Sequence, residues 1–511
     1  MKKLSIIIIL FAALMLQTMS CSRDFLETAP TNSANVDDFK ASFEGARMLL
    51  VGVNRTRFIN NTPIATATVS FGEGAIIDLL EGLSDDFFES PVGVTAASRW
   101  LEEMSLHSEM VGSSAAAIPW NMLYEMISPL NQLLALVDEV QNSTEAQRNW
   151  LTAQALAYRA HFFHLLVRIY GPAYHHSPDE LGIVLALEHS TQGIARSTVR
   201  ESYAQIREDL HEALRLMGEP GVSAIAAAHD RTFISLRVMH GVLSRVYLDM
   251  HNWTEAARFA NLAGTGVPLM TRPQFMEGFY IVNPEWMWAS FVPGDEGTMF
   301  HSQPSMRTHV PGMYPGAWGF THNISQILVD HTDSARDVRI GGLTDTLTPS
   351  LMIHFRNEPL SYNKFRWTAA GDPYNILYMR GAEMMLNEAE ALLMANTDIA
   401  RARTLVQELI NARIDDDGEF AATLDAMDRD ELLAELKMQR RLEFWGEGIR
   451  WFDLKRRGET VDRRGSGVNL AGVHPMTQVI SNPQSRWWTF RIPEREVRVN
   501  PIVVQNPDLP W

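Results

Sequence analysis

Apolar residues recur at helical spacing along the N-terminal part of the chain. Between residues 37 and 217, several stretches repeat them at steps of three and four, the pattern of amphipathic helices. The stretches AQALAYRAHFFHLLVRIYG and ESYAQIREDLHEALRLM follow this pattern, and the first ends at Gly171-Pro172, a helix stop signal. A third, WNMLYEMISPLNQLLALVDEV, has its apolar side chains at Trp120, Leu123, Tyr124, Ile127, Leu130 and Leu134.

Helices also come in pairs. The stretch RTFISLRVMHGVLSRVYLDMHNWTEAARFANLA predicts two short helices around a turn at His251-Asn252. Small alanines at the expected crossings are typical of tetratricopeptide-type repeats, although the period is degenerate here. The pattern therefore predicts a mostly α fold, built on a tetratricopeptide-like scaffold of helix pairs.

The pattern changes between Gly264 and Pro373, where glycine, proline and aromatic residues replace the helical stripe. This region reads as loops with a few short strands. In EWMWASF, Trp286 and Trp288 alternate as in a strand, so we expect both on one side and at least one in the core. Helices are expected to resume at ILYMRGAEMMLNEAEALLMAN, and the proline-rich tail is expected to be irregular.

The N-terminus has the features of a bacterial lipoprotein signal. Lys2 and Lys3 precede an apolar run from Ile6 to Leu16, which is too short to span a bilayer comfortably. Cys21, the only cysteine, follows it and cannot form an internal disulfide. We expect Cys21 to carry the lipid anchor; the alternative is a signal cleaved nearby with an incidental cysteine.

Charge limits the choice of partner. The formal net charge is −17, and loss of Lys2 and Lys3 with the signal takes it to −19. Because nucleic-acid binding depends on neutralising phosphates, this excess argues against a nucleic acid as partner. No other stretch is long and apolar enough to cross a membrane.

The stretch RRLEFWGEGIRWFDLKRRG, from Arg440 to Gly458, combines many charges with much aromatic surface. Read as one helix, it has an apolar face and a flanking charge stripe whose spacings allow mutual ion pairs. Gly446 and Gly448 indicate close approach of another backbone or a local break. We expect a structural role, with the stripe partly buried and paired. The face is Leu442, Trp445, Ile449 and Phe452, and the stripe is Arg440, Glu443, Glu447 and Arg450.

This stretch also resembles the C-terminal signature of the SusD/RagB family of outer-membrane nutrient-binding lipoproteins. Other elements agree in order: CSRDFLETAP after the cysteine, DVR at 337–339, MRGAEMMLNEAEALL, INAR, IPEREVRVNP and QNPDLPW. The resemblance covers essentially the whole chain. The matching positions in the signature are Arg440, Arg441, Glu443, Glu447, Gly448, Arg450, Asp453 and Leu454.

The resemblance implies binding rather than catalysis. Similar proteins sit on the outer face of the outer membrane as lids on a TonB-dependent transporter of the SusC type. They capture oligosaccharides, or peptides in the RagB branch, without a cofactor. Their fold has four tetratricopeptide-like helix pairs under a loop-rich ligand face. We accordingly expect a signal peptide at 1–20, a helical N-terminal region at 21–263 and a C-terminal region at 264–511, packed as one unit.

Other candidates for chemistry have plainer interpretations. His161 and His164 share a helical face and could ligate a metal, but their apolar surroundings favour packing or hydrogen bonding. His175-His176 is a weak metal signal. The pair Asp85-Asp86 and the run from Asp415 to Asp417 could supply acid/base pairs or calcium ligands, but such acidic runs are expected to be solvated. We predict no catalytic or metal site. A helical glycoside hydrolase is the enzyme alternative, because its two carboxylates need not be near in sequence.

Aromatic residues in loops are the candidates for contact with ligand. Flat rings with a polar handle suit the apolar faces of sugars. The alternative is that these rings fix the loops to the scaffold. Thirteen tryptophans and the family resemblance favour a glycan over a peptide. The candidates are Trp100, Tyr314, Trp318, Phe320 and Trp367.

Overall fold

A computed structural model gives the structure of the chain. The residues that it describes are 36–59, 72–85, 87–89, 114–188, 192–227, 231–279, 282–292, 322–324, 331, 336–339, 352–353, 361–362, 364, 374–462, 479–482 and 485–507.

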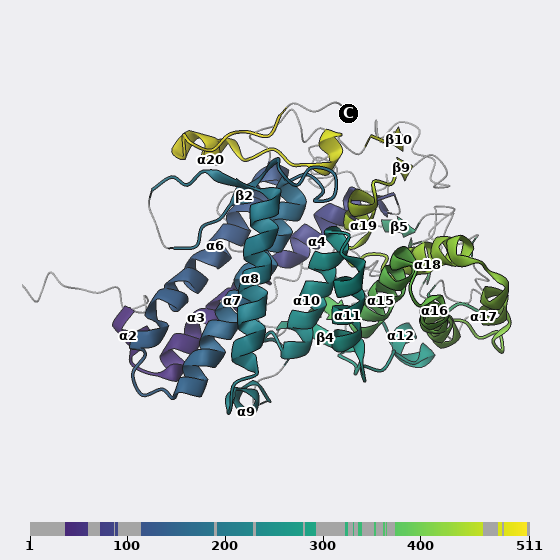
Figure 1. Ribbon diagram of the computed structural model, residues 1–511, viewed down its shortest axis with the longest axis horizontal. Helices are drawn as coiled ribbons and strands as arrows, with labels where there is room; N and C mark the ends of the chain where they lie inside the picture. Colours follow the sequence, from purple (N-terminus) through teal and green to yellow (C-terminus); the bar gives the residue numbers. More distant parts are fainter. Residues whose placement is uncertain are drawn as a thin grey trace, which may run out of the picture.

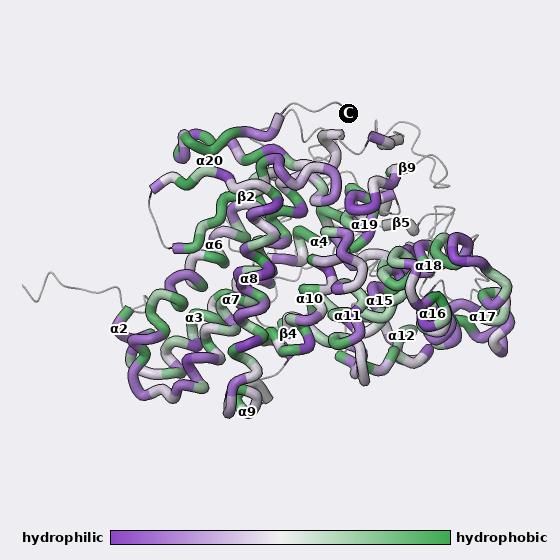
Figure 2. Tube along the Cα trace, viewed as in Figure 1, coloured by the Kyte–Doolittle hydropathy of each residue, from purple (hydrophilic) through white to green (hydrophobic). Residues whose placement is uncertain are grey.

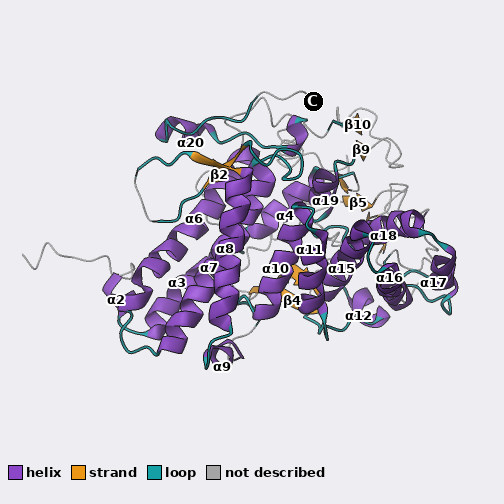
Figure 3. Cartoon of the chain, in the orientation of Figure 1, coloured by secondary structure: helices purple, strands orange, loops and turns teal. Residues whose placement is uncertain are grey.

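Helices dominate the described residues, and the strands are few and short beside them (Figures 1 and 3). The predicted mostly α class is confirmed. The helices are α2 (Val36–Lys40), α3 (Phe43–Thr56), α4 (Glu73–Gly82), α6 (Ser114–Leu136), α7 (Glu145–Tyr170), α8 (Val199–Met217), α9 (Val222–Ala227), α10 (Leu236–Asp249), α11 (Trp253–Gly264), α12 (Arg272–Glu277), α15 (Gly381–Ala395), α16 (Ile399–Arg413), α17 (Glu419–Thr423), α18 (Arg429–Glu443), α19 (Arg450–Arg457) and α20 (Glu494–Val499).

Neighbouring helices pair along the chain as predicted. Helices α6 and α7, α7 and α8, α10 and α11, and α15 and α16 lie side by side, and α11 packs against α15 to continue the array (Figure 1). The turn at His251-Asn252 is confirmed: His251 has φ of 56°, and Asn252 caps α11 by accepting a hydrogen bond from the Glu255 amide at 3.3 Å.

Helix α7 lies at the centre of the N-terminal helices. Its residues are buried on all sides, so its apolar residues do not form one stripe. The polar residues along it find buried partners, as where Arg159 binds Asp209 at 2.7 Å. On the outer helix α8, by contrast, buried residues recur at steps of three and four, and Figure 2 shows hydrophobic and hydrophilic residues in turn along it.

The short strands form small sheets. Strand β2 (Leu181–Val184) pairs with β3 (Arg196–Thr198), and β9 (Val461–Asp462) pairs with β10 (Val479–Ile480). Strand β4 (Trp286–Val292) pairs antiparallel with β8 (Tyr374–Arg380). A four-stranded sheet has the order β1-β5-β7-β6, with β1 at Phe87–Glu89, β5 at His322–Ile324, β7 at Ser361–Tyr362 and β6 at Met352–Ile353.

Strand β4 corrects one expectation. Trp286 and Trp288 are both in the core, as predicted, but they do not share a side. Trp286 packs in a cluster with Phe279, whereas Trp288 packs in the main core against His161 at 4.7 Å between ring centroids. The pairing register of β4 with β8 shifts at Trp288, and such an irregularity breaks the strict alternation of faces.

Two boundaries also differ from the sequence interpretation. Residues 376–380 form the end of β8 rather than the start of a helix, because this apolar segment pairs with β4 and α15 begins only at Gly381. The tail is not wholly irregular, since α20 forms between its prolines. Among the described helices, none is long and apolar enough to cross a membrane.

The stretch from Arg440 to Gly458 is two helices, not one. Helix α18 ends at Glu443, α19 begins at Arg450, and residues 444–449 between them are called the glycine turn below. Gly446 and Gly448 have φ of 79° and 76°, values that suit glycine. Both expectations for the glycines hold at Gly448: the helix breaks there, and the Ile77 main chain approaches so closely that a Cβ would lie 3.3 Å from the Ile77 Cα. The single apolar face is wrong.

We expect Gly448→Ala to destabilise the protein by at least about 1–2 kcal/mol, because an alanine there is held in the left-handed region. Its Cβ would also meet Ile77 Cγ2 at 3.0 Å. The control is Gly52→Ala in α3, where no atom lies within 4 Å and alanine should stabilise by about 0.5–1 kcal/mol. Urea unfolding measures both; equal stability of the two variants would contradict the prediction.

Candidate functional site

The side chains predicted to touch ligand or lipid lie outside the described residues. The strands that adjoin three of their segments in sequence are described. The residues concerned are Cys21, Trp100, Tyr314, Trp318, Phe320 and Trp367.

The four-stranded sheet brings three of these segments to one end. Glu89 lies opposite His322, and Asn323 lies opposite Ser361, so β1 and β7 both run antiparallel to β5. Two strands that oppose the same neighbour run parallel to each other. The end at which β1 and β7 finish is therefore the end at which β5 begins.

All five candidate aromatics belong to segments that adjoin this end. Trp100 follows Glu89 by eleven residues, and Trp367 follows Tyr362 by five. Phe320 precedes His322 by two residues, with Trp318 and Tyr314 just before it. The sheet therefore brings together the strand ends that three distant stretches of chain adjoin in sequence.

The chain before β1 is anchored to the glycine turn and to α19. The Glu81 carboxylate accepts a hydrogen bond of 2.6 Å from the Gly448 amide. Asp85, just before β1, accepts two hydrogen bonds from Arg450, at 2.8 and 2.9 Å. Asp85 is buried, so the expectation that it is solvated is wrong. Asp86 lies outside the described residues.

The chain after β5, on the other side of the strand from Phe320 in sequence, is anchored to α18. His331 lies 3.2 Å from the Glu435 carboxylate. Arg339 is fully buried and donates a hydrogen bond of 2.7 Å to Gln439. Its own neighbour Asp337 holds the guanidinium from the other side at 2.7 Å.

The third segment is anchored through Lys364, two residues after β7. Its ammonium group donates to the main-chain oxygens of Glu443 and Trp445, at 2.8 and 3.0 Å, and contacts the Glu447 carboxylate. Of these anchors, only Lys364 lies on the side of its strand that leads in sequence to a candidate aromatic.

Beneath the glycine turn lies a group of buried charges that we call the charged hub. Arg380, the last residue of β8, donates to Glu443 at 2.6 Å, to Glu285 at 2.7 Å and to Glu447 at 2.8 and 2.9 Å. Arg413, at the end of α16, donates to Glu443 at 2.9 Å. The hub comprises Glu285, Arg380, Arg413, Glu443 and Glu447.

The electrostatics of the hub follow from this pairing. Burial alone would raise the pKa of Glu443, but the guanidinium groups of Arg413 and Arg380 lower it well below its usual value. Arg380 and Lys364 likewise lower the pKa of Glu447 against the effect of burial. Both carboxylates are therefore ionised at neutral pH, and each is compensated by buried cations.

The prediction that the charges of this stretch are buried and paired is confirmed, but the predicted partners are wrong. Glu443 pairs with β8 and α16, and Glu447 pairs with β8 and Lys364. Neither pairs with a neighbour in the stretch itself. Arg440 pairs with Asp453 of α19 at 2.6 Å, and Arg450 pairs with Asp85. The break at the glycine turn removes the helical geometry that mutual pairs require.

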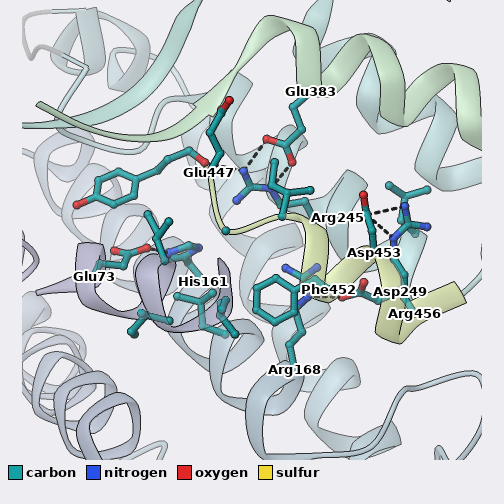
Figure 4. A pocket seen from close by; sticks show the side chains of 18 of the residues that line it. Glu73, His161, Arg168, Arg245, Asp249, Glu383, Glu447, Phe452, Asp453 and Arg456 are labelled. Carbon is teal, nitrogen blue, oxygen red and sulfur yellow. Dashed lines mark hydrogen bonds and ion pairs between the residues drawn. The ribbon is translucent and has the colours of Figure 1, made fainter. Parts of the chain in front are cut away.

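A small polar cavity lies behind the glycine turn (Figure 4). Its volume is about 60 Å³. That is room for roughly four to six waters at about 10–15 Å³ each, and far below the roughly 300 Å³ of a small-molecule site. Figure 4 shows Arg245 facing Glu383 and Arg456 facing Asp453 in its wall. The cavity is therefore part of the scaffold.

The histidines of α7 line or adjoin this cavity and act as hydrogen-bonding residues, as predicted. His161 lies 2.7 Å from Glu73, and His164 lies 2.7 Å from Asp249. Burial lowers the pKa of His164 to about 4, which keeps it neutral at physiological pH. Within the described ranges, no three His, Cys, Asp or Glu residues are arranged to hold a metal ion.

The remaining polar candidates have local roles. The ring of His175 stacks on His251, with centroids 3.9 Å apart, and lies tilted against His176, with centroids 3.7 Å apart. Asp416 accepts hydrogen bonds from the amides of Gly418 and Phe420 at the start of α17, so it is not simply solvated. These contacts fix turns of the scaffold.

Sequence reasoning missed Lys364 and most of the hub. One signal was present: Arg380 interrupts the apolar run ILYMRGAEMML, and an arginine in such a run must find buried partners. The partners themselves lie 63 to 95 residues away, so no local pattern identifies them.

We expect Glu443→Gln to lower the free energy of unfolding by about 3–5 kcal/mol, because it leaves buried arginine charge uncompensated. The matched control is Glu212→Gln, which removes an exposed pair with Arg215 and should cost less than about 1 kcal/mol. Chemical denaturation of both variants measures the difference. A loss at Glu443 as small as that at Glu212 would show that the hub does not depend on this carboxylate.

Two family profiles and one related protein match parts of this chain. A profile of the SusD family matches residues 346–508, and a profile described as starch-binding and associating with the outer membrane matches residues 80–248. A SusD-like protein of Formosa agariphila is 34% identical over 107 residues, and this match spans about a fifth of each chain.

Solved structures share the fold along most of the chain. A SusD-like carbohydrate binding protein of Bacteroides vulgatus has a TM-score of 0.74 at 23% identity, covering 91% of this chain and 97% of its own. A SusD superfamily protein of Bacteroides thetaiotaomicron has a TM-score of 0.73 at 20% identity, covering 91% and 100%. These likenesses confirm the helix-pair scaffold.

Proposed function

This chain belongs to the SusD/RagB family, and from that premise we propose that it is a nutrient-binding lipoprotein of the outer membrane. In this proposal it faces the cell exterior, captures an oligosaccharide and delivers it to a TonB-dependent transporter of the SusC type. A protein that only binds cannot itself move ligand across a membrane, so the transporter is a required partner.

The convergence of three segments at one end of the β1-β5-β7-β6 sheet is the observation that carries this proposal. Candidate aromatic rings adjoin all three strand ends in sequence, and Lys364 anchors the chain that leaves β7 to the glycine turn. Loops that are held before ligand arrives pay a smaller ordering cost on binding. We infer a platform of rings that stack on the apolar faces of sugars.

An oligosaccharide is favoured over a peptide. One matching family profile is described as starch-binding, and a structural neighbour is named a carbohydrate binding protein. A peptide ligand of the RagB type is the alternative. A glycan array and a peptide library, screened with protein lacking residues 1–21, distinguish the two.

Binding rather than catalysis fits the buried carboxylates. Glu443 and Glu447 are held ionised by buried cations, which suits a scaffold and not a general acid that must carry a proton near neutral pH. A glycoside hydrolase would release reducing ends from polysaccharide. Binding without such release supports the capture protein.

We propose that the chain is divided into a signal at 1–20 and two regions, 21–263 and 264–511, that form one unit. One hydrophobic cluster contains residues of both regions, including Leu243 and Ile376. The side chain of Trp487 near the C-terminus donates a hydrogen bond to the main-chain oxygen of Leu83.

We expect Cys21→Ala to release the protein from the outer membrane, because no other anchor is proposed. Membrane fractionation measures the release, and mass spectrometry of the wild-type N-terminus checks lipidation. In mild detergent, the wild type should co-purify with a TonB-dependent transporter. Full membrane retention of the variant, with an unlipidated wild-type N-terminus, would refute the anchor.

We expect Trp318→Ala to weaken glycan binding by about 1–3 kcal/mol, by analogy with stacking of aromatic side chains on bases. Its Tm should fall little, and the affinity should depend little on salt, because a neutral glycan has no charge to screen. Isothermal titration compares it with the wild type and with Trp253→Ala, a half-buried tryptophan of α11. Unchanged affinity would remove Trp318 from the site, and loss of the fold would show that it fixes a loop.

A further inference from the structure

Four rings form a column between the loop that follows α7 and the start of α11, and we call this column the histidine stack. Trp253 stacks on His251 with ring centroids 4.5 Å apart, and His251 stacks on His175 at 3.9 Å. His176 lies tilted against His175 at 3.7 Å and is exposed, whereas the other three residues are half-buried. Because the lone pairs of an imidazole lie in its ring plane, stacked rings cannot direct them at one metal ion.

The histidine stack connects three parts of the chain. His175 and His176 belong to the loop after α7, and His251 forms the turn between α10 and α11. The Nε2 atom of His251 lies 2.8 Å from the main-chain oxygen of Arg456 in α19. Since a carbonyl oxygen only accepts, this nitrogen carries the proton of the neutral ring and donates the hydrogen bond. The helix pairs of the N-terminal region are thus tied to α19 through imidazole rings.

The turn at His251 is strained. The residue has φ of 56°, in the left-handed region that costs free energy for a residue with a side chain. Such a conformation persists only where the surrounding contacts hold it. Here the two ring contacts of His251 and its hydrogen bond to Arg456 contribute to holding it. Loss of these contacts therefore favours opening of the turn.

An added proton is poorly accommodated in this arrangement. The Nδ1 atom of His175 is buried and has no hydrogen-bond partner among the described residues. Both nitrogens of a charged imidazole are donors, so Nδ1 would become a buried donor without an acceptor. A charge on His251 as well would place two imidazolium groups at stacking distance. Burial, with the neighbouring His251 and His176, lowers the pKa of His175 to about 3, and burial also lowers the pKa of His251.

Charged groups face the stack from three helices. The carboxylate of Asp249 favours a proton on His175 or His251, whereas the guanidinium group of Arg456 disfavours it. Two further cations line a small pocket beside Asp249. The groups are Asp249 of α10, Glu390 of α15 and Arg456 of α19, with Arg168 and Lys455 in the wall of the pocket.

The carboxylates of this set keep their charge in mild acid. Against the effect of burial, Arg168 and His164 lower the pKa of Asp249 to about 2. Arg456 holds the pKa of Glu390 well below its usual value, again against the effect of burial. His164 faces Asp249 from α7, and burial lowers its own pKa to about 4. A fall from neutral pH to pH 5 therefore acts on the histidines and leaves these carboxylates ionised.

We propose that the histidine stack is an acid-sensitive clasp. Its neutral rings hold the loop after α7 and the turn before α11 against α19, and protonation of His175 and His251 releases both. The clasp concerns only contacts within the scaffold, so its test is independent of the proposed ligand and transporter.

The sign of the effect follows from proton binding. His175 has a pKa of about 3 in the closed loop and near 6.5 when exposed, so between these values the open loop binds more protons. Opening is therefore favoured as the pH falls through this window, and the contribution of His175 to closure is complete only above about pH 6.5. His251 acts in the same direction, because its pKa in the closed turn is also lowered.

Hydrogen exchange of the wild type between pH 7 and 5 tests the clasp. The reporters are the amides of His176 and Asn252. They donate to the main-chain oxygens of Ala173 and Tyr247, at 3.1 and 2.9 Å. After correction for the intrinsic effect of pH, we expect both to exchange about tenfold faster at pH 5, since opening takes up about one proton. Low, non-denaturing urea should not change these rates, because local opening exposes little surface.

The double variant His175→Phe/His251→Gln removes the titration but keeps the contacts. Phenylalanine retains a flat ring for stacking, and glutamine retains an N–H for the Arg456 oxygen. The acid response of the two reporters should shrink to less than about twofold. The matched control is His240→Gln in α10, a half-buried histidine outside the stack whose pKa burial also lowers, to about 4. This control should keep the response of about tenfold.

Three kinds of result would overturn the clasp. Corrected exchange that stays level in the wild type would show that opening takes up no proton. Reporter exchange that follows urea as steeply as that of amides in the middle of α7 would show that the two turns open only by global unfolding. A full response in the double variant, or its loss in His240→Gln, would assign the acid response to other groups.

Discussion

The guanidinium group of Arg380 is the contact on which the rest of the arrangement depends. Its five N–H donors meet five oxygens, from Glu285, Glu443 and Glu447 and from the main chain of Glu443. Because the group is buried and always charged, the fold must bring these oxygens to it or leave a charge without compensation. Strand β8, the end of α18 and the glycine turn can therefore meet in few ways.

The hub adds geometric precision more than net stability. Replacing a group of buried ion pairs by well-packed apolar residues is often neutral or stabilising. The contribution of the hub is therefore that its charges are paired in few alternative arrangements of the chain. The same elements also fix the positions of neighbouring parts of the chain. The same helix and turn that hold Arg380 also hold Arg339 and Lys364, so α18 and the glycine turn fix chain on both sides of the four-stranded sheet in sequence.

Local patterns in the sequence predict the parts of this structure that local physics determines. Helices α7 and α8, the turn at His251-Asn252 and the break at Gly446 and Gly448 all depend on neighbours in the chain. Strand β8 was missed because ILYM suits a buried helix and a buried strand equally, and only pairing with β4 decides between them.

The candidate site depends even more than the fold on contacts between residues that are distant in the sequence. Aromatic residues in loops can be selected from the sequence, but their convergence depends on the strand order β1-β5-β7-β6, which joins segments more than two hundred residues apart. The partners of Glu443 and Glu447 were wrongly assigned for the same reason: helical spacing offered nearby arginines, whereas tertiary contacts supply Arg380, Arg413 and Lys364.

A densely charged hub beneath a surface proposed for a neutral ligand is physically consistent. The three carboxylates of the hub are balanced by Arg380, Arg413 and the adjoining Lys364, so the net field beyond them is small. The hub can thus fix where loops leave the scaffold without imposing a charge requirement on what they bind. Loop sequences beyond those points can then vary, and with them the ligand, while the anchors and the scaffold stay the same.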